Sequence, residues 1–109
     1  MHELAITESL VEAVTEHAGG SRVMRVSLEI GKLSGVVADS VRFCFDVCTR
    51  GTSLDGATLE IVEPPGRAFC RDCNREVEIE DFFALCACGS ANLEVRGGRE
   101  LRIREMEVE

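Results

Sequence analysis

The sequence predicts an α+β fold: two helices packed on a small mixed sheet, with a small β module inserted before the last strand. Three observations carry this prediction. Two segments space their apolar residues as helices do, three alternate apolar and polar residues as strands do, and a cysteine-rich stretch separates the last two strands. A chain of 109 residues has room for one compact domain, or for one domain that carries a small module.

The first helix is predicted over residues 4–18. Its apolar side chains recur in steps of three and four residues, and glutamates occupy another face. Gly19-Gly20 then provides the left-handed conformation with which helices commonly end. The apolar positions are Ile6, Leu10, Ala13 and Val14.

The second helix is predicted from about residue 39 to Thr49. Asp39 or Ser40 could cap its N-terminus, and Gly51 follows its end. An apolar stripe with helical spacing should pack this helix on the sheet. The stripe consists of Val41, Cys44, Phe45 and Cys48.

The first two strands show the period of two that indicates one buried face. In the first strand, polar residues separate Met24, Val26, Leu28 and Ile30. In the second, Leu59 and Ile61 alternate with polar residues, and Pro64-Pro65 ends the strand.

The last strand changes phase. Leu101 and Ile103 alternate in one phase, and Met106 and Val108 in the other. Because neighbouring residues of a strand face opposite sides, this switch predicts a bulge or twist near Glu105, or a strand that serves two surfaces. The strand is apolar enough to belong to the main sheet.

The stretch between these strands lacks a helical period, and four of the six cysteines fall within nineteen of its residues. We therefore predict two units. Residues 1–63 and 99–109 form an α+β domain, and residues 64–98 form an inserted unit that we call the cysteine module.

The cysteine module predicts a structural zinc site. Two close cysteine pairs can place four thiolates around one Zn²⁺ at about 2.3 Å. A unit this small cannot bury enough apolar surface to fold alone, so the metal would supply much of its folding free energy. The pairs are Cys70 with Cys73, and Cys86 with Cys88.

Only one residue separates the second pair, so it cannot make the same turn as the first. The alternatives to a four-thiolate zinc site are a redox dithiol, a metal site completed by another ligand, and weak or lost zinc binding. Cys44 and Cys48 lie apart from the module, and we expect them to fill the core.

Composition argues against several classes of protein. Twenty acidic residues outweigh twelve basic ones and give a formal charge of −8, which disfavours binding to nucleic acid or to an anionic membrane. No window approaches the ~18 apolar residues of a membrane span, and no secretion signal is visible at the N-terminus. We therefore expect a cytoplasmic protein whose cysteines are thiols rather than disulfides.

The first three residues predict a second metal site. If the terminal amine of Met1 is free, this amine, the His2 amide and the His2 imidazole form two consecutive chelate rings with three in-plane nitrogens. Glu3 or another group could fill the fourth position. Such nitrogen and oxygen donors favour Ni(II) or Cu(II). The alternative is a solvated histidine that binds no metal.

Four motifs taken together resemble the HypA/HybF family of nickel metallochaperones. They occur in order and cover nearly the whole chain. They are Met1-His2-Glu3-Leu4, residues 30–36 (IGKLSGV), residues 43–46 (FCFD), and the four cysteines with Cys88-Gly89-Ser90.

The resemblance implies a maturation protein and not an enzyme. It implies Ni(II) bound as transferred cargo at Met1, His2 and Glu3, and structural Zn(II) held by the four cysteines of the module. It implies delivery of nickel to the large subunit of [NiFe]-hydrogenase, together with a HypB-type GTPase, and in some organisms to urease. We expect a monomer or a homodimer. The family pattern Cys-Pro-x-Cys-Gly is one residue longer than Cys86-Ala87-Cys88-Gly89.

Two other classes of protein compete with this interpretation. A small zinc-stabilised interaction adaptor would bind zinc but no stoichiometric nickel. A thiol redox enzyme would use Cys70 and Cys73, but these cysteines lie in no βαβ pattern. The sequence contains no Ser/His/Asp set and no phosphate-binding loop.

Overall fold

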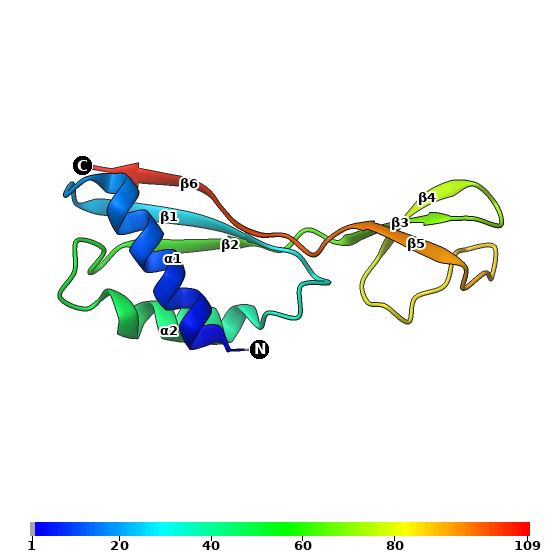
Figure 1. Ribbon diagram of the computed structural model, residues 1–109, viewed down its shortest axis with the longest axis horizontal. Helices are drawn as coiled ribbons and strands as arrows, with labels where there is room; N and C mark the ends of the chain where they lie inside the picture. The colour runs from blue at the N-terminus through cyan, green and yellow to red at the C-terminus, as the bar shows by residue number, and fades with distance from the viewer. Residues whose placement is uncertain (1) are drawn as a thin grey trace.

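The computed structural model describes residues 2–109 and shows an elongated molecule with one sheet at each end (Figure 1). Its extents are 53 × 22 × 17 Å, and its radius of gyration is 17.0 Å. A compact chain of this length would have a radius of gyration of about 13 Å. The two ends are therefore separate packing units joined by a narrow waist.

The first unit is a mixed three-stranded sheet in the order β2-β1-β6, which we call the main sheet. Strand β1 runs parallel to β2 and antiparallel to β6, so the last strand of the chain returns to the main sheet. The predicted α+β class with a mixed sheet is confirmed. Its elements are α1 (Glu3–Ala18), β1 (Val23–Ile30), α2 (Ala38–Thr49), β2 (Thr58–Val62) and β6 (Leu101–Val108).

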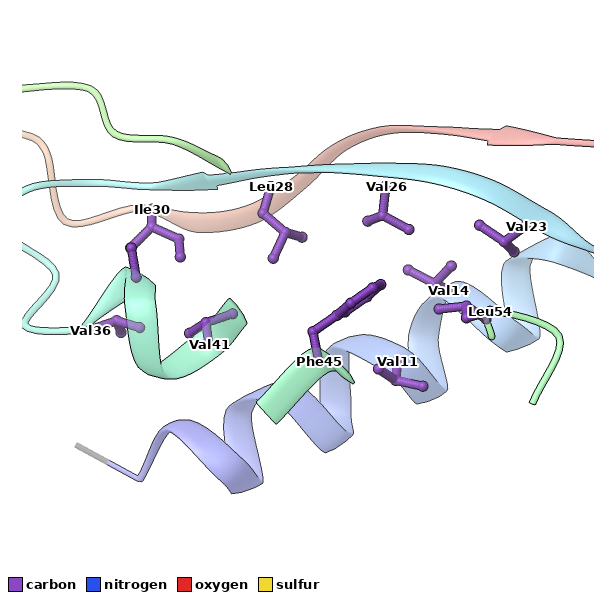
Figure 2. Close-up of a cluster of buried hydrophobic side chains, with 11 residues drawn as sticks. Val11, Val14, Val23, Val26, Leu28, Ile30, Val36, Val41, Phe45 and Leu54 are labelled. Atoms are coloured by element: carbon purple, nitrogen blue, oxygen red, sulfur yellow. The ribbon is translucent and has the colours of Figure 1, made fainter. Parts of the chain in front are cut away.

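Both helices cover the same face of the main sheet, and the larger core lies between them and the strands (Figure 2). Its buried side chains come from α1, β1, α2 and the connecting loops. They are Val11, Val14, Val23, Val26, Leu28, Ile30, Val36, Ala38, Val41, Phe45 and Leu54.

The buried side of α1 differs from the predicted stripe. Val14 is buried, and Ile6 and Leu10 pack against the core while partly exposed, as predicted. Thr7 and Val11 are buried as well, whereas Ala13 is exposed. Thr7 can be buried because its hydroxyl donates to the Glu3 carbonyl at 2.7 Å. A polar residue thus occupies a core position that a search for apolar periodicity does not find.

The buried face of β1 also differs at its start. Met24 is exposed and Val23 is fully buried, whereas alternation predicted Met24 in the core. The register with β6 shifts between Val23 and Arg25, so the strand changes face at this point. Val26, Leu28 and Ile30 are buried as predicted.

The phase switch in β6 is a bulge, as predicted. Ser27 of β1 pairs with Glu105, and Leu28 pairs with Ile103, so Arg104 is the extra residue. The bulge returns the following apolar residue to the core face. Leu101, Ile103 and Met106 therefore all pack on the same core, while Val108 is exposed.

Helix α2 begins earlier than predicted. Its N-cap is Val37, no side chain caps the helix from that position, and Asp39 lies in the first turn, where it pairs with Arg42 at 2.7 Å. The prediction that Asp39 or Ser40 caps the helix was wrong, because the helix already begins at Ala38 and both residues lie in its first turn. The Val37 N–H donates to the Glu3 carboxylate.

The stripe along α2 is confirmed at three of its four positions, but Cys44, which we expected in the core, is not among the residues that pack there. Val41 and Phe45 are buried in the main core. Cys48 packs against the core while partly exposed, and Cys44 is half-buried.

The second unit is an antiparallel sheet in the order β4-β3-β5. It has a small core of its own, formed by Leu33, Ala68 and Ile79. Its strands are β3 (Gly66–Cys70), β4 (Arg75–Ile79) and β5 (Leu93–Gly97). All three lie within the predicted cysteine module, whose exact bounds at residues 64 and 98 stay a prediction.

In the waist, the loop that follows β1 makes hydrogen bonds and an ion pair with the cysteine module and its flanking residues. The Leu33 N–H donates to the Gly98 carbonyl at 2.8 Å, and the Lys32 N–H donates to the Pro64 carbonyl at 3.0 Å. The Lys32 ammonium also pairs with Glu80 at 2.7 Å. This loop therefore connects the main sheet to the cysteine module through backbone and side-chain contacts.

Candidate metal centres

The four cysteines of the module form one cluster. Their sulfurs all lie within 4.8 Å of one another. The closest approaches join the two pairs, because Cys70 Sγ lies 3.7 Å from Cys88 Sγ, and Cys73 Sγ lies 3.6 Å from Cys86 Sγ. The structure thus brings together all four predicted ligands, including both members of the shortened pair.

The first pair lies on the turn between β3 and β4. Cys70 is the last residue of β3, and the Asn74 N–H donates to its carbonyl at 2.8 Å. Asn74 has a φ of 57°, a left-handed conformation that asparagine tolerates better than most residues. The turn places Cys73 beside Cys70.

The second pair lies on a turn of different form. The Gly89 N–H donates to the Cys86 carbonyl at 2.8 Å, and the Cys86 N–H donates to the Ser90 carbonyl at 2.9 Å. Because Gly89 has a φ of 89°, the chain reverses directly after Cys88. The shortened Cys-x-Cys pair therefore places both of its sulfurs in the cluster by a turn that differs from the turn of the first pair.

The spacing of the sulfurs fits a tetrahedral zinc ion. Four sulfurs at about 2.3 Å from one Zn²⁺ lie about 3.8 Å from one another. The two closest sulfur pairs are within about 0.2 Å of that value. The cluster is compatible with structural zinc, and an all-thiolate site leaves no open position for catalysis.

Backbone amides and burial shift the pKa values of the first cysteine pair in opposite directions. The N–H groups of Cys73 and Asp72 donate to the Cys70 thiolate and lower the pKa of Cys70 to about 6. Burial, together with contact with the other sulfurs, raises the pKa of Cys73 to about 12. Binding of a divalent metal by these thiols as thiolates would release protons.

Polar contacts join the two turns outside the sulfurs. The Ser90 hydroxyl donates to the Asp72 carboxylate, and the Arg71 N–H donates to the Asn92 carbonyl at 3.1 Å. The Ser90 hydroxyl in turn accepts the Asn92 N–H at 2.9 Å. These contacts hold the second turn against the first. Spacing of cysteines alone does not reveal them.

The second predicted site lies at the start of α1. His2 is exposed and is the N-cap residue of the helix, and its carbonyl accepts the Ile6 N–H at 3.1 Å. Within residues 2–109, no hydrogen bond uses the His2 imidazole or the His2 amide. The Met1 amine, the third predicted nitrogen ligand, lies outside the described residues.

Glu3 is anchored to the other helix. Its carboxylate Oε2 accepts the Val37 N–H at 3.2 Å, and this contact lowers the pKa of Glu3 below its ordinary value. The negative charge also lies at the positive end of the α2 dipole. The first turn of α1 is thereby fixed beside α2, with a shallow hollow lined by Glu3, Leu4, Asp39, Ser40, Phe43 and Cys44.

Sequence reasoning missed the contribution of Val37. Its amide holds Glu3, yet a backbone donor carries no signal in a residue pattern. It also missed Leu33, whose side chain belongs to the core of the cysteine module. Leu33 lies in the motif of residues 30–36. That motif contributed to the family resemblance, but the sequence analysis assigned it no structural role.

The fold and its sites define a class: a small α+β metal-binding protein with a sheet that carries a four-thiol site. Within residues 2–109, no helix combines the length and the apolar character needed to cross a bilayer.

Comparisons with known proteins identify the family. The family described as "Hydrogenase/urease nickel incorporation, metallochaperone, hypA" matches residues 1–108. The hydrogenase maturation factor HypA of Nostoc sp. (strain PCC 7120) is 56% identical over 109 residues, covering 100% of this chain and 96% of the relative. That of Geobacter metallireducens is 51% identical over 110 residues and is covered completely, as is this chain.

A solved structure agrees with these matches. The solution structure of the Ni metallochaperone HypA from Helicobacter pylori superposes with a TM-score of 0.67 and 25% identity, over 99% of this chain and 97% of that one. The chain belongs to the HypA family of nickel metallochaperones of hydrogenase maturation. The predicted family resemblance is confirmed.

Proposed function

We propose that this protein binds one Ni²⁺ at its N-terminal Met1-His2-Glu3 motif and delivers it to the large subunit of [NiFe]-hydrogenase. The observation that carries this proposal is the position of His2: it is exposed, precedes the first residue of α1, and makes no hydrogen bond among residues 2–109 through its imidazole or its amide. Both nitrogens are therefore available to a metal.

The start of a helix suits amide coordination. The first amides of an α-helix have no acceptor within the helix, so metal binding by the His2 amide breaks no helical hydrogen bond. The positive end of the helix dipole disfavours a bare cation. A nickel ion bound through a deprotonated amide carries less positive charge, so this ligand offsets the effect of the dipole.

Glu3 supplies either the fourth ligand or the anchor of the site. Its Oε2 is engaged with Val37, and Oε1 is not used in any hydrogen bond among the described residues. A metal site at a chain end can give up its ion by stepwise ligand exchange without unfolding of the domain. This property suits a carrier whose cargo must pass to another protein.

We also propose that Cys70, Cys73, Cys86 and Cys88 hold a structural Zn²⁺ and that residues 64–98 fold as one module around it. The sulfur spacing and the separate small core of β3–β5 support this assignment. Zinc would supply a rigid link between the two turns, while the protein's own contacts orient them.

The partners follow from the delivery role. We propose that a HypB-type GTPase takes part in the transfer, that the protein acts in the cytoplasm without binding nucleic acid or membranes, and that urease is a second recipient. No catalytic step is required of the protein itself, because carrying and releasing an ion breaks no covalent bond.

A titration of untagged, zinc-loaded protein with Ni²⁺ tests the proposal. The wild type should bind about one equivalent, and His2→Ala should lose this binding while keeping its zinc. His17→Ala is the matched control, since His17 is the only other histidine of the chain. Affinity should also fall between about pH 7.5 and about pH 6, because protons compete for the ligand nitrogens.

Two results would contradict the nickel site. One is stoichiometric Ni²⁺ binding by His2→Ala, which would place the site elsewhere. The other is a well-folded wild type that binds zinc and ignores nickel, which is the result expected of the interaction adaptor. Thiol labelling of zinc-loaded protein separates the redox alternative, because closed zinc thiolates should resist the label.

A further inference from the structure

The four sulfurs of the cysteine cluster differ in how far solvent reaches them. Cys70 and Cys86 are buried, Cys73 is half-buried, and Cys88 is exposed. The residues directly before and after Cys88 are exposed as well. A small reagent in the solvent therefore reaches Cys88 before the other three cysteines.

The exposure of Cys88 follows from the shortened spacing of its pair. The hydrogen bond from the Gly89 N–H to the Cys86 carbonyl closes a four-residue turn. Ala87 and Cys88 are the two central residues of this turn, and both lie outside the strands of the cysteine module. The second thiol of the pair therefore lies at the tip of the turn.

A buried thiol of the other turn lies beside Cys88. The Sγ atoms of Cys70 and Cys88 are 3.7 Å apart. A disulfide bond is about 2 Å long, so a small shift of the exposed tip would bring the two sulfurs to bonding distance. The hydrogen bond between Ser90 and Asp72 holds the two turns together without the sulfurs. Cys70 is thus in position to react with an oxidised Cys88.

We propose that Cys88 is an oxidation site, at which hydrogen peroxide forms a sulfenic acid and Cys70 converts it to a disulfide that opens the zinc site. The proposal rests on the zinc assignment made above and adds a reaction to it. A thiolate that solvent reaches, with a second thiol beside it, is the arrangement that favours this chemistry. The thiols of Cys44 and Cys48 lie on α2, outside the cluster, and take no part.

The reaction has two steps and consumes one peroxide. The Cys88 thiolate attacks one oxygen of the peroxide, the O–O bond breaks, and hydroxide leaves and takes up a proton as water. The Cys70 thiolate then attacks the Cys88 sulfur, so that the S–S bond forms and the S–O bond breaks. A second hydroxide leaves and is protonated by solvent. The two sulfurs have lost two electrons, and the peroxide has become two waters.

The disulfide removes two of the four thiolates that a structural zinc site requires. Cys73 and Cys86 alone provide two ligands, so the zinc is released. The new bond keeps the two turns joined, and a thiol reductant regenerates both thiols and restores zinc binding. Coordinated sulfurs are weaker nucleophiles than free thiolates, so the reaction needs an excess of peroxide, whereas a brief thiol label leaves the cluster closed.

Peroxide treatment of untagged, zinc-loaded full-length protein tests the proposal. Excess hydrogen peroxide should release the zinc, which a chromogenic chelator measures. Peptide mass spectrometry after alkylation should find a disulfide between Cys70 and Cys88, and dimedone added with the peroxide should trap a sulfenic acid at Cys88. Dithiothreitol followed by Zn²⁺ should restore one zinc per chain. None of these readouts uses nickel, so they do not depend on the nickel site.

Cys88→His removes the exposed thiol and keeps a zinc ligand, since three cysteines and one histidine form an ordinary zinc site. Its zinc release in peroxide should be slower by about tenfold or more. Cys73→His is the matched control, because it makes the same replacement at a half-buried ligand and leaves Cys70 and Cys88 in place. It should release zinc as readily as the wild type. If either variant does not retain zinc, the disulfide map of the wild type decides.

Three results would overturn the proposal. One is zinc-loaded wild type that keeps its zinc in excess peroxide. Another is a disulfide confined to one turn, between Cys86 and Cys88 or between Cys70 and Cys73. The third is equal zinc release from Cys88→His and Cys73→His. A wild type that takes up no zinc at the outset would instead refute the zinc assignment, and this proposal with it.

Discussion

The side chain of Leu33 lies directly on the backbone of Gly66. A Cβ atom at position 66 would be 2.4 Å from Leu33 Cδ1 and 2.9 Å from Ile79 Cγ1. Leu33 follows the first strand of the main sheet, yet its side chain is buried among residues of the cysteine module. The absence of a side chain at Gly66 is therefore what allows the module to close on the loop from the main sheet.

Gly66→Ala should loosen the cysteine module. The added methyl group has no room, so Leu33 must move out of its site, and overpacking of this kind costs about 1–3 kcal/mol. The measurement is urea unfolding of zinc-loaded protein, with hydrogen exchange to locate the change in β3 and β4. The nickel stoichiometry should be unaffected, because the N-terminal motif is not part of this contact.

A double variant tests whether Leu33 is the cause. Leu33→Ala alone should cost about 2–5 kcal/mol through the cavity it leaves. If the two residues act through one contact, Leu33→Ala/Gly66→Ala should cost less than the sum of the single variants. Additive losses would show that the strain at Gly66 arises elsewhere.

Much of the fold could be predicted because the spacing of apolar residues along a helix or strand follows the side that is buried. The stripe on α2 and the phase switch of β6 each correspond to side chains that pack on the main core. Prediction failed where a local hydrogen bond or a shift in strand register changed which side chains are buried. Thr7 enters the core because its hydroxyl bonds within its own helix, and Met24 leaves it because the register shifts beside it.

The candidate sites divide in the same way. Four cysteines with pairwise spacing predict a cluster, since thiols of this pattern serve few other purposes, and the structure brings their sulfurs together. The contact between Glu3 and the Val37 amide could not be predicted, because it joins a side chain to a backbone donor thirty-four residues away. Sequence patterns contain no record of such a donor.

Loss of one thiol should unfold the cysteine module and leave the main sheet folded. Cys70→Ser should abolish stoichiometric zinc binding, because a four-thiolate site loses a buried ligand. Structural zinc contributes about 10–16 kcal/mol to the folding of small modules, so β3–β5 should lose protection from hydrogen exchange while β1 keeps it.

Cys44→Ser is the matched control for this experiment. Cys44 is a thiol on α2, outside the cluster, and its replacement should leave one zinc per chain. Zinc content by mass spectrometry and exchange by residue give the two readouts. Full zinc retention in Cys70→Ser would show that the four-thiolate assignment is wrong.

Ionisation of Glu3 should make the free energy of unfolding depend on pH in the acidic range. Its pKa is lowered in the folded protein by the Val37 N–H, so its contribution is fully present above the unfolded value of about 4.3 and is lost as the pH falls through the folded pKa. Glu3→Gln lacks this component. The difference in the free energy of unfolding between wild type and variant should therefore shrink from about pH 6 to about pH 3.

Glu12→Gln is the control for Glu3, because Glu12 is an exposed glutamate of the same helix with no ion pair among the described residues. Its difference from the wild type should stay small and flat over that range. A pH-independent difference for Glu3→Gln would indicate that Glu3 acts through packing rather than through its charge.

Residues added before Met1 should weaken nickel binding, because they convert the terminal amine into an amide and remove one nitrogen of the proposed chelate. Calorimetric titration of Ni²⁺ into the untagged chain and into a chain with a short Gly-Ser extension makes the comparison, with zinc content held equal. We expect a loss of about a hundredfold in affinity, which corresponds to about 2.7 kcal/mol of binding free energy. The extension leaves Glu3 and the His2 imidazole in place, so their contribution should survive as weak binding that His2→Ala then removes. Equal affinities for the two chains would assign the fourth position to a side chain and exclude the terminal amine as a ligand.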